Sequence, residues 1–196
     1  MNKYLVIIAL GVLGFITTVF SKDVPAPASK NIDYTNTKKA HFAGGCFWGV
    51  EHLFEKQKGV KDVISGFMGG HVQNPSYRAV VKGDTGHVET VEVVYNPAEI
   101  SFESLAKLFF EIHDSTQKNG QGPDIGSQYL SVVFYDNEEE KKTTEKLIDI
   151  LKTKGYDVAT TLRPSSPFYA AEAYHQDYYV RTGKTPYCHV YKKIFD

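Results

Sequence analysis

Hydrophobic and polar positions in the central part of the chain predict two helices and four strands. A short apolar stretch over 41–43 ends at Gly44-Gly45, and apolar residues then recur at helical spacing from Phe47 to Gly59. Ser101 caps a second helix. Alternating or valine-rich segments typical of strands occupy 60–67, 88–95 and 129–135. The order βαββαβ predicts an α+β fold, a two-layer ferredoxin-like sheet with the helices on one face.

The pattern that follows the fourth strand predicts an elaboration of this core by extra helices and loops. Asp136 and Glu139 form a capping-box-like start of a charged helix that ends at Gly155. A short strand near Val158 and a helix that ends before Gly183 complete the chain. We therefore expect one folded domain.

The N-terminus has the pattern of an export segment. Lys3 precedes an uncharged run over 5–20, which predicts a signal peptide over 1–21. At about 1.5 Å per residue the run spans about 24 Å as a helix, so an uncleaved membrane anchor is the less favoured alternative. A polar linker over 22–39 leads to a single domain over 40–196. We expect a periplasmic or cell-envelope location, or an anchored domain facing the extracytoplasmic side.

Charge and composition exclude several classes of partner. The 196 residues carry 22 basic and 23 acidic side chains, so nothing indicates nucleic-acid binding. Two cysteines are too few for a disulfide-dense scaffold. No ligand spacing typical of a metal site and no phosphate-binding glycine pattern occurs.

Cys46 is the strongest candidate nucleophile. It follows two glycines at the predicted start of a helix, where backbone N–H groups and the helix dipole would stabilise a thiolate. The alternative is half of a structural disulfide with Cys188, about equally common in an exported protein with two cysteines. The glycines favour the nucleophile, because they let the backbone approach a ligand closely.

Other candidates depend on their surroundings. Glu89 shares a strand face with valines and a tyrosine, so it is either exposed at the strand end or buried with a raised pKa, as a general acid would be. Trp48 cannot face the same core as Phe47, because adjacent helical residues point about 100° apart. Tyr77 and Asp124 do not stand out without further information, and the same holds for Tyr129.

Four motifs together resemble the A-type peptide methionine sulfoxide reductases over about residues 41–179. They are Gly45-Cys46-Phe47-Trp48-Gly49, Gly86-His87-Val88-Glu89, the passage from Thr116-Gln117 to Gln121-Gly122-Pro123-Asp124-Ile125-Gly126-Ser127-Gln128-Tyr129, and Ala171-Glu172-Ala173-Tyr174-His175-Gln176-Asp177-Tyr178. Because four spaced motifs occur in the right order, the resemblance is specific.

The resemblance implies a role for each candidate. Cys46 is then the nucleophile and Glu89 the acid that protonates the sulfoxide oxygen. The methyl-binding pocket is formed by Phe47 and Trp48, and the hydrogen-bonding partners are Tyr77, Asp124 and Tyr129. The implied substrate is the S epimer of methionine sulfoxide, free or in proteins, and no bound cofactor is needed.

Recycling would depend on Cys188, because the chain ends at Asp196 without the further tail cysteines that many members carry. Cys188 condenses with a sulfenic acid on Cys46, and a thioredoxin-like protein reduces the disulfide. We expect the tail to fold over the site only in this step, and a monomer. Departures from the family pattern lie outside the catalytic positions, at Phe67, Met68, Ser115 and Leu130.

Two rival functions remain at this stage. One is a cysteine hydrolase that uses Cys46 with a histidine base, although no orienting Asn or Asp can be assigned to it. The other is an exported binding module with a permanently oxidised Cys46–Cys188 bridge. That alternative leaves the glycine-flanked turn around Cys46 without a purpose.

Overall fold

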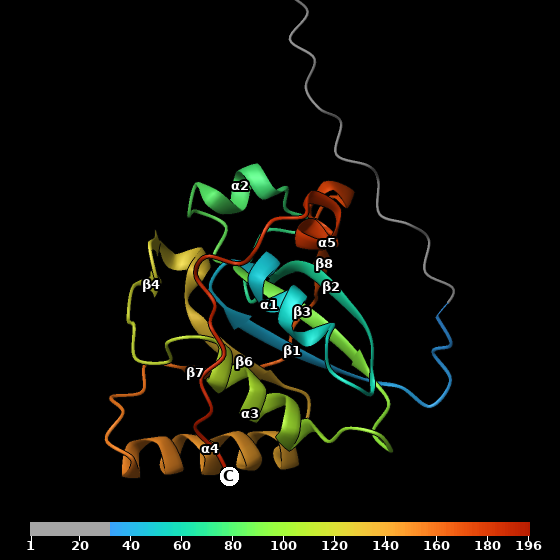
Figure 1. The fold of residues 1–196 in the computed structure, drawn as a ribbon. Coiled ribbons are helices and arrows are strands. Elements are labelled where there is room, and N and C mark those ends of the chain that lie inside the picture. The colour runs from blue at the N-terminus through green and yellow to red at the C-terminus, as the bar shows by residue number, and fades with distance from the viewer. Residues whose placement is uncertain (1–31) are drawn as a thin grey trace, which may run out of the picture.

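The computed structural model describes residues 32–196, which form a mixed sheet with helices packed on it (Figure 1). The main sheet contains β1 (Lys38–Gly44), β2 (Val60–Met68), β3 (Val88–Tyr95), β6 (Ser131–Tyr135), β7 (Thr161–Pro164) and β8 (Tyr169–Ala170). Its strand order is β7-β6-β1-β3-β2-β8. The neighbours in β6-β1-β3-β2 are antiparallel, and β7 pairs with β6 in parallel. The predicted α+β class is confirmed.

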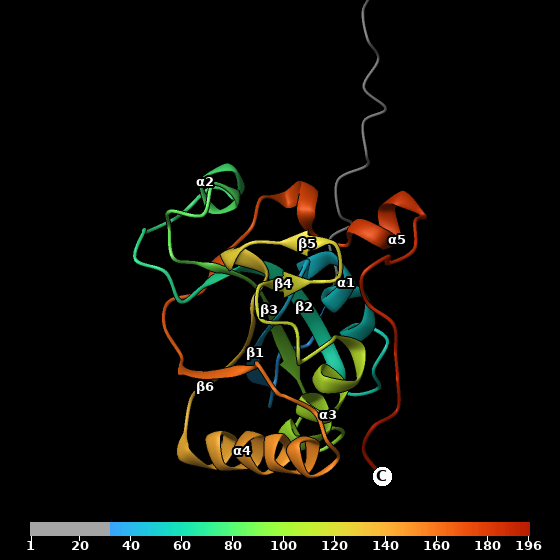
Figure 2. The ribbon, with the colours of Figure 1, turned by 90° about the vertical axis from the view of Figure 1, so that its left-hand side faces the viewer.

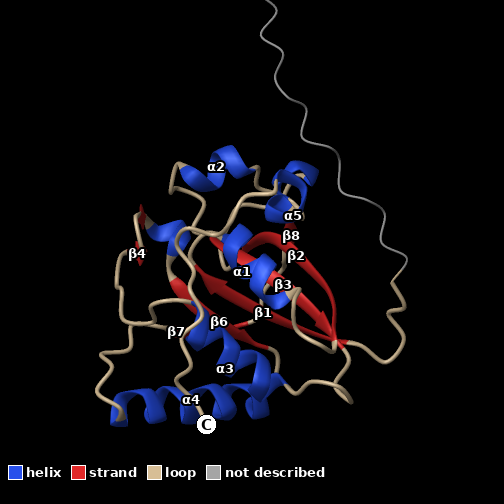
Figure 3. Ribbon diagram, viewed as in Figure 1, coloured by secondary structure: helices blue, strands red, loops and turns tan. Residues whose placement is uncertain are grey.

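Helices cover one face of this sheet and surround one of its ends. They are α1 (Phe47–Phe54), α2 (Tyr77–Val81), α3 (Phe102–Ile112), α4 (Glu138–Thr153) and α5 (Tyr178–Thr182). Both α1 and α3 pack on the sheet, and α4 packs against α3 and β6 (Figure 2). Figure 3 shows α2 and α5 beyond the same end of the sheet, and the turned view in Figure 2 shows them on opposite sides of that end.

The core lies between the sheet and the helices α1 and α3. Phe42 of β1 is fully buried, and its ring stacks 5.2 Å from the rings of both Phe54 and Phe109. Each such buried side chain contributes roughly 1.5–3 kcal/mol relative to an exposed one. Val91 and Val93 of β3 belong to the same cluster. The prediction that one face of β3 is apolar is therefore confirmed, and this face is turned toward the helices.

A smaller cluster covers the opposite face of the sheet. Met68 and Phe134 are buried there, and Phe168 packs against them from the segment that leads into β8. His41 of β1 also faces this side, 5.6 Å from the Phe168 ring. The last strand and its lead-in thus shield the second face.

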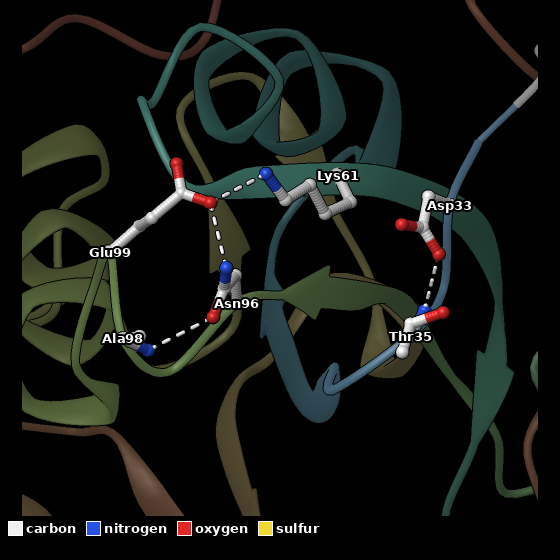
Figure 4. Close-up of polar contacts among 6 residues, drawn as sticks. All are labelled: Asp33, Thr35, Lys61, Asn96, Ala98 and Glu99. Carbon is white, nitrogen blue, oxygen red and sulfur yellow. Dashed lines mark hydrogen bonds and ion pairs between the residues drawn. The ribbon is translucent and has the colours of Figure 1, made fainter.

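A network of polar side chains fixes the turn between β3 and α3 (Figure 4). Asn96 accepts a hydrogen bond from the Ala98 N–H at 3.0 Å, and its amide donates to Glu99 at 2.7 Å. The Lys61 ammonium on β2 also donates to Glu99 at 2.7 Å. Asn next to Pro is typical of such turns, because its side chain satisfies a backbone N–H two residues on.

Four local predictions differ from the structure. The helix predicted from Phe47 to Gly59 is α1, which ends at Phe54. The cap of α4 is Asn137, whose side chain accepts from the Glu140 N–H, so the helix begins one residue later than the Asp136 prediction. The strand placed near Val158 is β7, which begins at Thr161. Tyr129 is not the first residue of a strand but ends a 3₁₀ turn before β6.

Several short elements were not predicted. The helix α2 lies between the predicted strands over 60–67 and 88–95, and β4 (Gly120–Gln121) pairs with β5 (Asp124–Ile125) as a small hairpin. Each has five residues or fewer, too short to show periodicity.

The predicted signal peptide over 1–21 and the first part of the linker lie outside the described residues. The linker's last two residues belong to β1. Within 32–196, no helix has the length and apolar character needed to cross a membrane.

Candidate active site

A tight turn at the end of β1 places Cys46 at the start of α1. Gly45 has φ 95°, a left-handed conformation that suits glycine, and Cys46 is the N-cap residue of the helix. A side chain on Gly45 would also collide with Gln121, which packs against the turn. The close approach predicted for these glycines is therefore made by the chain itself.

Cys46 lies beside the second cysteine. Its side chain is 6% exposed, both cysteines are free thiols, and the two side chains are within hydrogen-bonding distance. The neighbouring Cys188 thiol and burial raise the pKa of Cys46, and they outweigh a hydrogen bond from the Trp48 N–H that lowers it. In this arrangement the second thiol and burial therefore oppose the thiolate that the start of the helix was expected to stabilise.

Glu89 reaches the same turn from β3. Its Oε2 accepts a hydrogen bond from the Phe47 N–H at 3.1 Å, and the side chain is 1% exposed. Burial, together with the nearby Cys46, raises the pKa of Glu89 well above its ordinary value. Of the two environments considered for this carboxyl group, the buried one is observed, and the group is a neutral acid that can donate a proton.

Aromatic rings surround the outer side of the Cys46 turn. Phe47 is 1% exposed and Trp48 is half-buried. Trp48 packs against the core cluster that contains Phe47, and both rings lie against His175, so the prediction that the two cannot face one core is wrong. The Trp48 ring stacks on Tyr178 with 3.8 Å between centroids, and its Nε1–H donates to His175 Nδ1 at 3.1 Å. The Tyr77 ring lies 4.3 Å from His175. These rings form an aromatic surface next to the turn around Cys46.

Two tyrosine hydroxyls lie near the Glu89 carboxyl group. Tyr77 and Tyr129 lie close enough to Glu89 and Cys46 to interact with both electrostatically. Burial, followed by the nearby Glu89, raises the pKa of Tyr77 and raises that of Tyr129 to about 12. Both phenols therefore keep their protons at neutral pH and can donate hydrogen bonds to an oxygen.

The C-terminal tail already covers the site in this structure. It runs from α5 past α1 and along α3 toward α4, in both Figures 1 and 2. Tyr187 donates from its hydroxyl to both carboxylate oxygens of Asp124, at 3.0 and 2.8 Å. The prediction that the tail folds over only during one step is wrong, and Asp124 serves the tail rather than its own turn.

Three further residues of this region were not singled out from the sequence. Tyr187 anchors the tail, His175 holds Trp48, and His189 is buried against the turn around Cys46. The motif that contains His175 was visible, and His189 directly follows Cys188 in the sequence. Their contacts join segments 63, 127 and 145 positions apart, for which a single sequence gives no signal.

A cavity of about 480 Å³ lies between the tail, the end of α3 and the β4–β5 hairpin. Its lining includes Cys188, Tyr187 and Gly122, and the Cys188 side chain is half-buried. Among the described residues, no three His, Cys, Asp or Glu side chains are placed to hold a metal ion.

Comparison with known proteins places this geometry in context. The family model described as "Peptide methionine sulfoxide reductase" matches residues 38–195. A protein of Nautilia profundicola described as peptide methionine sulfoxide reductase MsrA is 46% identical over 150 residues, which cover 76% of this chain and 87% of that protein.

Solved structures are similar as well. The crystal structure of Mxr1 from Saccharomyces cerevisiae in reduced form has a TM-score of 0.77 and 35% identity, covering 84% of this chain and 98% of that chain. Mxr1 in complex with Trx2 has a TM-score of 0.56 and 25% identity, covering 86% of this chain and 99% of that one.

Proposed function

The chain belongs to the A-type peptide methionine sulfoxide reductase family, and from this premise we propose how its site performs and completes the reaction. It is a peptide-methionine (S)-S-oxide reductase, an oxidoreductase that returns methionine sulfoxide to methionine. The observation that carries the proposal is the meeting of the Cys46 and Cys188 thiols next to the neutral Glu89 carboxyl group.

In the first step, the Cys46 sulfur attacks the electrophilic sulfoxide sulfur. Glu89 gives its proton to the sulfoxide oxygen, and the proton of Cys46 returns to the Glu89 carboxylate. The hydroxyls of Tyr77 and Tyr129 donate hydrogen bonds to the same oxygen. The S–O bond of the substrate and the transient S–S bond break as the hydroxyl group passes to the Cys46 sulfur. Methionine leaves and Cys46 becomes a sulfenic acid, so the substrate sulfur is reduced by two electrons and Cys46 is oxidised by two. No bound cofactor takes part.

The substrate methyl group is assigned to the aromatic surface of Phe47 and Trp48. The support for this assignment is the stacking of Trp48 on Tyr178 and its hydrogen bond to His175, which fix the indole beside Cys46. A held ring can orient the sulfoxide sulfur toward the thiol. Asp124 contributes indirectly, by holding Tyr187 and with it the tail.

In the second step, Cys188 condenses with the Cys46 sulfenic acid, and a disulfide and water form. A thioredoxin-like dithiol then reduces the disulfide. The similarity to Mxr1, which has been solved in complex with Trx2, supports this partner. Because Cys188 is more exposed than Cys46 and borders the cavity, the incoming thiolate attacks the Cys188 sulfur.

The proposal includes location, assembly and fold. The uncharged run over 5–20 supports export and the repair of oxidised proteins outside the cytoplasm, with the anchored form as the alternative. The enzyme is proposed to act as a monomer. The order β6-β1-β3-β2 supports a ferredoxin-like core. Cell fractionation combined with thiol trapping tests location and partner together.

One experiment distinguishes this function from its rivals. Reduced enzyme is mixed with methionine sulfoxide, and free thiols and methionine are counted. The proposal expects two thiols lost for each methionine formed. A cysteine hydrolase or a binding module with a permanent bridge would leave the thiol count unchanged, and that result would refute the mechanism.

A further inference from the structure

His189 follows the second cysteine and is buried at the turn around Cys46. Its side chain is 4% exposed, and its Nε2 lies 2.7 Å from the Gly44 carbonyl oxygen. A carbonyl oxygen only accepts hydrogen bonds, so Nε2 must carry the ring proton. Its other nitrogen, Nδ1, then has a free lone pair, provided that the ring is neutral.

The free lone pair faces the Cys188 thiol. The Cys188 Sγ lies 3.0 Å from His189 Nδ1, a short distance for a hydrogen bond to sulfur. With the tautomer fixed by Gly44, the thiol must be the donor and Nδ1 the acceptor. The arrangement of carbonyl, imidazole and thiol is the one that activates a nucleophile through an oriented base.

We propose that His189 is the general base that takes the proton of Cys188 while its sulfur attacks the sulfenic acid on Cys46. This inference rests on the two-cysteine mechanism proposed above. The Cys188 S–H bond breaks toward Nδ1, the S–S bond forms, and the S–O bond of the sulfenic acid breaks. Hydroxide leaves, takes up the proton from the imidazolium through solvent and departs as water. Cys46 is reduced by one electron and Cys188 is oxidised by one.

Such a base addresses a difficulty in the second step. Without assistance, a thiol with the ordinary pKa of about 8.5 is only a few per cent thiolate at neutral pH. Burial lowers the pKa of His189, although its bond to Gly44 opposes this, so the ring is neutral and ready to accept a proton. Because Cys188 is its direct neighbour, the base travels with the thiol whenever the tail moves.

Other titratable groups face the histidine from the elements around it. The Asp124 carboxylate of β5 favours the charged ring. His113, after α3, interacts with it across the core, and burial lowers the His113 pKa to about 4, so that ring is neutral. The Cys46 thiol lies beyond Cys188. None of them supplies a second base within hydrogen-bonding distance of Cys188.

The test separates the two steps of the reaction. Reduced enzyme is mixed with one equivalent of methionine sulfoxide, and methionine formation and thiol loss are followed separately from pH 5 to pH 9. His189→Gln keeps an N–H that can reach Gly44 but has no basic nitrogen. His41→Gln is the matched control. His41, a residue of β1, is a buried histidine like His189, but it lies on the opposite face of the sheet.

The expected result is selective for the second step. In His189→Gln, one methionine per enzyme forms at the wild-type rate, whereas disulfide formation slows on the order of 100-fold near neutral pH. A sulfenic-acid probe then labels Cys46. The deficit shrinks as pH rises, because a thiol loses its proton to solvent more readily at high pH and then needs no internal base. The control variant keeps both rates.

Three outcomes would overturn the proposal. A wild-type rate of disulfide formation in His189→Gln would do so, and so would a deficit that is the same at every pH, since that indicates a merely displaced tail. The wild-type enzyme provides a measurement that does not depend on whether the variant folds. Its rate of disulfide formation should not change with pH above the lowered pKa of His189. A rate that instead climbs tenfold per pH unit up to pH 8 excludes an internal base. If wild-type enzyme forms no methionine, the proposed function fails instead.

Discussion

Replacing Glu89 by Gln tests the acid of the first step with little change in shape. The glutamine carbonyl can still accept the Phe47 N–H that now bonds Glu89 Oε2 at 3.1 Å. The amide has no proton to give to the sulfoxide oxygen. The turn around Cys46 should therefore stay in place while the chemistry loses its donor.

The magnitude follows from the burial of this carboxyl group. At 1% exposure, water cannot replace the lost proton donor. General acid catalysis contributes typically 10²–10⁴-fold, or about 3–5 kcal/mol of the barrier. We expect the first-step rate of Glu89→Gln, measured as methionine formed in a single turnover, to fall within that range at pH 7.

The direction of the pH dependence follows from the raised pKa of Glu89. Because burial disfavours the carboxylate, the folded state keeps this proton to higher pH than the unfolded chain, whose Glu pKa is about 4.3. The stability it contributes is fully present below the unfolded pKa and is lost as pH rises through the folded one. The wild-type first step should slow over the same window, and this slowing should be absent in Glu89→Gln.

Glu92→Gln provides the matched control. Glu92 lies three positions along β3 on the opposite face, where it binds Lys39 at 2.9 Å and His41 at 3.1 Å. Its substitution should leave the first-step rate unchanged. If Glu89→Gln keeps a rate within tenfold of wild type from pH 6 to pH 8, Glu89 is only a buried strand residue and the mechanism is wrong.

The remaining predictions concern the two cysteines and the start of α4. Cys46→Ser should abolish methionine formation, since a hydroxyl is a far poorer nucleophile than a cysteine sulfur; turnover within tenfold of wild type contradicts the assignment. Cys188→Ser should give one methionine per enzyme and then stop with thioredoxin as reductant, and sustained turnover would show that the partner reduces the sulfenic acid directly. Asn137→Ala should lose about 1 kcal/mol in denaturant unfolding because its cap bond is removed, while Asp136→Ala should lose little; equal losses would contradict the observed cap.

The larger elements of the fold could be predicted because each carries its own periodicity. Ser101 and the apolar stripe of α3 predict that helix, and the alternation in β3 predicts both the strand and the shared face of Glu89 and Val91. The hairpin β4–β5 has two residues in each strand, and β8 has two as well. Strands this short are stabilised by pairing with a neighbouring strand, so the local pattern of apolar and polar residues does not predict them.

The candidate site was predictable to a similar degree. The residues of the Cys46 turn and Glu89 could be proposed from local chemistry, because a helix start and an apolar strand face are short-range features. The protonation state of Cys46 could not, since it depends on Cys188, 142 positions away by difference of the two residue numbers. A separation of 145 positions likewise conceals the hydrogen bond between His189 and Gly44.

Gly45 and Gly49, on either side of Cys46, must be glycine for different reasons. Gly45 needs its positive φ, whereas Gly49 has an ordinary helical backbone and needs only its small size. A side chain at Gly49 would collide with the His189 ring at Nδ1, the atom that faces Cys188. Because Gly49 has no side chain, the His189 ring has the space to contact both Gly44 and Cys188. A substitution as small as Gly49→Ala would displace the ring and the cysteine next to it, so the glycine that ends this motif is required by the second cysteine as much as by the first.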